Sequence, residues 1–144
     1  AVNSHSIGIE LANSGDAPFP EPQIAALDSL LRKIMARWSI PPRGVIAHSD
    51  MAPGRKGDPG PRFDWRRLAL CGLSVWPEDD PSEGASFAAS ARTFGYPDAP
   101  PAMLLAAFRL RFRPGVTGPE DAFDRAMVAN LAARFPVDAD ICTA

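Results

Sequence analysis

The sequence is poor in histidine and cysteine and carries little net charge. Only two His and two Cys occur among its 144 residues, and the net charge is −2. A chain without a basic surplus lacks the long-range attraction that drives binding to nucleic-acid phosphates or to anionic membranes. We therefore expect no nucleic-acid partner. Because histidine is scarce, a metal or acid–base site that uses one imidazole leaves a single other in the chain.

Long apolar runs are also missing. No segment approaches the roughly 20 consecutive apolar residues of a transmembrane helix, so we predict no transmembrane segment. No secretory signal pattern is found, and the chain begins Ala1-Val2-Asn3 without Met, which favours a processed or trimmed product whose targeting segment is gone. Cys71 and Cys142 leave two alternatives open, a disulfide formed in an oxidising compartment or two unpaired thiols.

The first half of the chain shows both strand and helix patterns. Residues 6–12 alternate, with Ile7, Ile9 and Leu11 on one face, which predicts a β-strand. The sixteen prolines cluster between apolar segments and mark the ends of elements. Three further elements are predicted here: a short apolar strand over 45–47 and helices over 21–38 and 63–73.

The second half is predicted to be helical. Residues 77–84 are acidic and interrupted by Pro and Gly, a composition typical of a linker. The sequence therefore predicts a first domain over 1–76 and a small helical module over 85–144. A unit of this size is near the lower limit for folding alone, so we expect it to pack on the first domain. Its apolar spacing predicts three helices, over 86–94, 102–112 and 120–135.

One loop rich in Pro and Gly, residues 48–61, holds His48, Lys56 and Asp58. Pro fixes the backbone of such a loop and Gly bends it, so the polar side chains can be held at defined positions. Neutral imidazole and carboxylate are good zinc ligands, but a catalytic zinc takes three protein ligands and one open position, and this loop supplies two. The alternative is that His48 is a satisfied core histidine and Asp58 a turn residue before Pro59.

Glu10 and Lys56 each allow a catalytic and a plain interpretation. A Glu10 buried near a metal takes a proton from a bound water, whereas an exposed Glu10 is an ordinary strand residue. Lys56 either stabilises an oxyanion formed on a substrate carbonyl or is a solvated loop lysine. We expect Asp50 to cap or orient the loop through hydrogen bonds to the backbone. The strand alternation places His5 on the face opposite Glu10, so His5 is not expected to be the missing ligand.

Two motifs together resemble a known family. They are Ser-Ile-Gly-Ile-Glu at 6–10 and His-Ser-Asp-Met-Ala-Pro-Gly-Arg-Lys-Gly-Asp-Pro-Gly-Pro at 48–61, separated by a helix. The pattern is similar to that of the zinc-dependent N-acetylmuramoyl-L-alanine amidases of the AmpD/AmiD type, which are related to peptidoglycan recognition proteins. The resemblance covers roughly residues 1–76 and corresponds to the C-terminal part of an amidase domain. It implies an α/β fold with a mixed central β-sheet flanked by helices.

By this resemblance, His48 and Asp58 are zinc ligands, Glu10 is the catalytic acid/base and Lys56 steadies the developing oxyanion. The implied reaction is hydrolysis of the amide bond between N-acetylmuramic acid and L-alanine in peptidoglycan or muropeptides, with Zn²⁺ as the cofactor. The third ligand, a histidine on a preceding strand in the family, is expected upstream of this chain. An associated N-terminal fragment of the same protein is then a further expected partner.

The helical module resembles, less specifically, a peptidoglycan-binding module that some of these amidases carry, and residues 108–118 account for the likeness. The alternative is a structural appendage without a ligand. If the module binds peptidoglycan, polymeric peptidoglycan is the favoured substrate. We therefore expect the protein in the periplasm or at the outer membrane rather than in the cytoplasm. Two rival functions remain, a metal-free interaction domain and a non-catalytic peptidoglycan-binding protein. Glu10 and Lys56 argue against the latter, because a receptor needs neither.

Overall fold

A computed structural model describes residues 5–15, 17–78 and 85–137 of the chain. Within these ranges the regular structure is helical and no β-strand is present. Every helix there is too short or too polar to span a bilayer. The elements are α1 (Glu21–Trp38), a 3₁₀ turn (Pro42–Gly44), α2 (His48–Met51), α3 (Trp65–Leu70), α4 (Phe87–Phe94), α5 (Pro101–Phe112) and α6 (Ala122–Arg134).

The predicted α/β class with a mixed central sheet is therefore wrong. Residues 6–12 and 45–47 were expected as strands, and neither segment pairs with a neighbour in the part of the chain that the structure describes. The backbone at Ala47 is extended, with φ −85° and ψ 157°. An extended segment becomes a strand only when another backbone lies beside it to accept and donate hydrogen bonds. Alternation along one segment carries no information about that partner.

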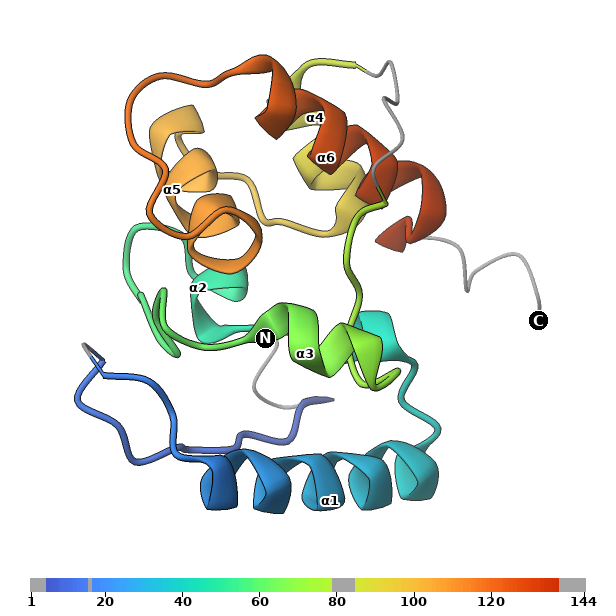
Figure 1. The fold of residues 1–144 in the computed structure, drawn as a ribbon. Helices are drawn as coiled ribbons and strands as arrows, with labels where there is room; N and C mark the ends of the chain where they lie inside the picture. Colours follow the sequence, from blue (N-terminus) through green and yellow to red (C-terminus); the bar gives the residue numbers. More distant parts are fainter. Residues whose placement is uncertain (1–4, 16, 79–84, 138–144) are drawn as a thin grey trace.

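The alternation identified only part of the face of residues 6–12 that packs, because Ile7 on that face is 49% exposed. Ile9 and Leu11 are partly buried against the apolar core, whereas Gly8 and Glu10 are exposed. Figure 1 shows this N-terminal segment running along α1 at the bottom of the molecule. The segment is thus held by side-chain packing on one side.

Helix α1 has the bounds that its periodicity predicted, Glu21–Trp38. Its buried residues, Ile24, Leu27 and Leu31, follow helical spacing and form one apolar stripe. Pro lies in its first turn, where the missing backbone donor has no cost, and Ser39 ends it in the left-handed conformation, with φ 53°. The predicted helix over 63–73 is shorter, because the chain turns at Gly72, with φ +72°.

Two apolar clusters organise the molecule, and partly buried Trp76 packs against both. Helices α4 and α6 pack against each other in the upper part of Figure 1, beside α5, while α2 and α3 lie between this part and α1. The lower cluster consists of Ile24, Leu27, Leu31, Ala47, Phe63, Trp65, Leu68 and Leu73. The upper cluster consists of Val75, Phe87, Ala91, Tyr96, Leu104, Ala107, Phe108, Phe112, Val128 and Leu131.

The three helices predicted in the second half are present with small shifts at their ends. Ser86 accepts a hydrogen bond from the Ala89 amide at the start of α4, and Gly95, with φ +119°, ends that helix. Most of the predicted linker, residues 79–84, lies outside the described residues. Cys71 is an exposed free thiol, and Cys142 also lies outside the described residues.

Candidate metal and catalytic site

The structure brings two of the predicted site residues together. The Nδ1 atom of His48 lies 3.0 Å from Oδ2 of Asp58. The two side chains are 42% and 60% exposed, so both are open to solvent and to an incoming ligand. His48 is therefore not a satisfied core histidine, and the imidazole and the carboxylate converge at the surface.

Local backbone hydrogen bonds produce this convergence. His48 is the first residue of α2, and the next residue, Ser49, donates its backbone N–H to the Asp58 carbonyl at 3.1 Å. Between them the chain reverses through Ala52, whose carbonyl accepts the backbone N–H of Lys56 at 3.1 Å, and Gly54, with φ +74°. Glycine adopts that positive φ without steric cost. The two candidate ligands are thus tied to one turn.

Asp50 orients the loop through the backbone, as predicted. Its Oδ2 accepts the N–H of Ala47 at 2.9 Å and so caps α2. The side chain is also buried, and its other partners come from far along the chain. Tyr96 donates its hydroxyl to Oδ1 at 2.8 Å, and Arg111 donates to Oδ2 at 2.5 Å. Burial, reinforced by the Asp50 carboxylate, raises the pKa of Tyr96 well above its ordinary value, so this hydroxyl remains a donor.

Arg111, which contacts Asp50 in this loop, was not anticipated from the sequence. It is 2% exposed and lies over the Trp65 ring, 4.4 Å from the ring centre. It also donates to Ser74 Oγ at 3.0 Å and to the Val45 carbonyl at 3.3 Å. One signal existed, because Arg111 continues the apolar spacing of Leu104 and Phe108 along α5, where a charged residue requires a buried partner.

Glu10 and Lys56 are exposed. Neither side chain makes a hydrogen bond or ion pair within the described residues, so the structure does not bring them into contact with the His48–Asp58 pair. Their catalytic roles remain predictions. Both side chains are available to a substrate.

The His48–Asp58 pair fits two positions of a zinc site. It offers one nitrogen and one carboxylate oxygen donor, the ligand types that catalytic zinc uses with water in an open position. No group of three potential metal ligands occurs among residues 5–15, 17–78 and 85–137. The third ligand, a histidine upstream of residue 1, stays a prediction.

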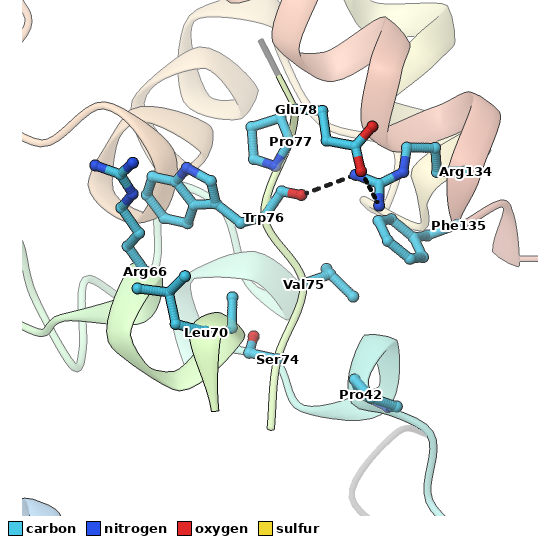
Figure 2. A pocket seen from close by; sticks show the side chains of 11 residues that line it. Pro42, Arg66, Leu70, Ser74, Val75, Trp76, Pro77, Glu78, Arg134 and Phe135 are labelled. Atoms are coloured by element: carbon cyan, nitrogen blue, oxygen red, sulfur yellow. Dashed lines mark hydrogen bonds and ion pairs between the residues drawn. The ribbon is translucent and has the colours of Figure 1, made fainter. Parts of the chain in front are cut away.

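Two cavities lie away from this pair. One, of about 360 Å³, lies between α3 and the end of α6, and Figure 2 shows Trp76, Leu70 and Phe135 around it. On one side Arg134 pairs with Glu78 at 2.8 Å and donates to the Trp76 carbonyl at 3.3 Å. The other, of about 490 Å³, lies along α5 and the loop before α6. No predicted site residue lines either cavity.

Known proteins match both parts of the chain. Residues 1–61 match the family described as N-acetylmuramoyl-L-alanine amidase. The chain is similar to N-acetylmuramoyl-L-alanine amidase AmiD of Escherichia coli, with 36% identity over 95% of the chain and 60% of that relative. It is also similar to 1,6-anhydro-N-acetylmuramyl-L-alanine amidase AmpD of Enterobacter cloacae, with 40% identity over 46% of the chain and 35% of that relative. The chain thus spans about 60% of the length of the AmiD relative.

Solved structures show the same likeness. The complex of Escherichia coli AmiD with the substrate anhydro-N-acetylmuramic acid-L-Ala-D-gamma-Glu-L-Lys matches with TM-score 0.71 and 35% identity, over 83% of this chain and 54% of that chain. AMPDH3 of Pseudomonas aeruginosa in complex with anhydromuramic pentapeptide matches with TM-score 0.74 and 30% identity, over 84% and 56%. These alignments cover more of the chain than residues 1–76 alone contain. The similarity therefore extends into residues 85–144, called the helical part below.

Proposed function

Because residues 1–61 match the N-acetylmuramoyl-L-alanine amidase family, we propose that the protein hydrolyses the amide bond between N-acetylmuramic acid and L-alanine. The observation that carries this proposal is the 3.0 Å approach of His48 to Asp58, within a loop of the family's pattern. Anhydro-muropeptides are the proposed substrates, because two similar solved structures hold molecules of that class.

His48 and Asp58 are proposed to hold Zn²⁺, together with the histidine expected upstream. When bound, zinc supplies a Lewis acid that polarises the substrate carbonyl and lowers the pKa of water. The openness of both side chains supports this role, since a catalytic metal must leave a position for water or substrate.

Glu10 is proposed to act as the general base and then as the general acid. Its carboxylate takes a proton from the attacking water and delivers it to the leaving nitrogen of L-alanine. The Lys56 ammonium offsets the negative charge that develops on the carbonyl oxygen. Support comes from the exposure of both side chains, with no competing ion pair in the described part of the chain.

Polymeric peptidoglycan remains a proposed second substrate, and the cell envelope the proposed location. The helical part supports this by its resemblance to peptidoglycan-binding modules, but its central arginines have internal partners. Arg109 pairs with Asp124, Arg111 with Asp50, and Arg113 with Asp121 and Asp124. A glycan ligand would therefore meet other side chains of this module.

The variant Glu10→Gln of the full-length protein is expected to retain muropeptide binding and to lose hydrolysis by about 100-fold or more, the usual range for a missing general acid–base group. Binding is measured by calorimetry with an anhydro-muropeptide, and hydrolysis by mass spectrometry of the released stem peptide. Glu120→Gln, at an exposed position in the helical part, is the matched control and keeps full activity.

The same two measurements distinguish an amidase from a non-catalytic peptidoglycan-binding protein. If the unsubstituted protein binds the muropeptide but releases no stem peptide, the non-catalytic peptidoglycan-binding protein is the correct function. Unchanged hydrolysis by Glu10→Gln leaves the amidase in place and removes Glu10 from its mechanism.

A further inference from the structure

The helical part reaches into the loop that carries the candidate zinc ligands. Arg111 and Tyr96 contact Asp50 across 61 and 46 residues of sequence, and all three side chains are buried. Arg111 lies between the Trp65 ring, at 4.4 Å, and the Phe112 ring, at 4.9 Å. Its guanidinium is thus held beside Asp50 by groups from both parts of the chain.

Asp50 transmits this restraint to both ligands. It lies two residues after His48 in the single turn of α2, and its Oδ2 holds the Ala47 N–H immediately before His48. Asp58 is held to the same turn by the hydrogen bond from the Ser49 amide to its carbonyl. Any displacement of Asp50 therefore displaces the backbone on which both ligands depend.

A second contact from the helical part acts on the far side of the loop. Gly54 lies against the side chain of Met103, which belongs to α5, so closely that a Cβ at this position would collide with it. Helix α5 therefore touches the loop at its start, through Arg111, and at its bend, through Met103.

We propose that Arg111 and Tyr96 are positioning residues of the zinc site: through Asp50 they set the separation of His48 and Asp58, so that the helical part is a structural component of the site. The inference rests on the proposed function for its connection with catalysis. The mechanical coupling itself needs only the contacts described above.

Tyr96→Phe in the full-length protein tests this inference with little disturbance of the core, because it removes one hydroxyl and keeps the buried ring. Loss of one hydrogen bond to a charged group is expected to speed amide hydrogen exchange at Ser49 by about tenfold. Zinc affinity is expected to fall by about 10- to 100-fold, as when other groups that orient metal ligands are removed. Arg111→Met is expected to give larger changes in the same direction.

Arg109→Met is the matched control, because it removes an equally buried ion pair from the same helix without touching Asp50. It is expected to lower the melting temperature while exchange at Ser49 and zinc affinity stay unchanged below the transition. Equal Ser49 exchange in Tyr96→Phe and the unsubstituted protein would overturn the coupling.

Exchange is recorded without metal or substrate, so it remains informative whatever the enzyme assay shows. Failure of the unsubstituted protein to hydrolyse muropeptides refutes the proposed function alone. Altered exchange with unaltered zinc affinity refutes the proposed effect on the metal site.

Discussion

His48→Ala is expected to abolish zinc binding by the full-length protein and to lower the proposed amidase activity by at least about 100-fold. That figure is the upper end of the loss seen when a group that merely orients a ligand is removed, so loss of the ligand itself costs at least as much. The side chain is 42% exposed, and the fold should therefore tolerate its removal. Zinc content is measured by mass spectrometry of the intact protein, and activity by stem-peptide release.

His5, the other histidine among these 144 residues, provides a control for this prediction. His5 is exposed, and His5→Ala is expected to leave zinc content and activity unchanged. A His48→Ala protein that still binds one zinc per chain and cleaves its substrate would remove His48 from the metal site.

Asp124→Asn destabilises the protein by about 3 kcal/mol or more, the range for breaking a buried ion pair by removing one partner. Asp124 is fully buried and accepts hydrogen bonds from Arg109, at 2.5 Å, and from Arg113, at 2.7 Å. The substitution leaves two guanidinium groups without their common carboxylate. Urea unfolding measures the loss.

Asp98→Asn is the matched control, because Asp98 also pairs with an arginine, Arg92, but is 88% exposed. Exposed pairs contribute about 1 kcal/mol or less, so this variant is expected to unfold at nearly the urea concentration of the unsubstituted protein. Equal losses from the two substitutions would show that burial of the Asp124 pair is unimportant.

Asp124 also gives the protein a defined acid sensitivity. Burial alone would raise its pKa, but hydrogen bonds from Arg109, the Asp121 amide and Arg113 hold the pKa at about 2. Because the folded pKa is below the unfolded value of about 3.9, the stabilisation is complete above about pH 4 and is lost as the pH falls toward 2. It amounts to roughly 2–3 kcal/mol, and this part of the pH dependence is absent from Asp124→Asn.

The helices were predictable because their signals are local. The stripe through Ile24, Leu27 and Leu31 requires only knowledge of helical spacing, and Gly95 ends α4 by a conformation that favours glycine. The strands were not predictable in the same way. Residues 6–12 alternate in sequence, but Ile7 is exposed and no backbone pairs with this segment within the described residues. Such pairing depends on residues elsewhere in the chain.

The part of the candidate site that lies within the loop 48–61 was predictable from the sequence. His48 and Asp58 lie ten residues apart, and the turn between them is set by nearby backbone hydrogen bonds. The side-chain partners of Asp50 could not be predicted, because Tyr96 and Arg111 lie 46 and 61 residues away in the sequence. A single sequence does not reveal which buried carboxylate an arginine in an apolar helix face will meet.

The most direct test of the proposed zinc amidase is stem-peptide release from an anhydro-muropeptide by the full-length protein, followed by mass spectrometry before and after zinc removal with a chelator. We expect two products from cleavage between N-acetylmuramic acid and L-alanine, loss of both when zinc is removed, and their return when zinc is restored. Release that persists without zinc, or cleavage at a different bond, would contradict the proposal.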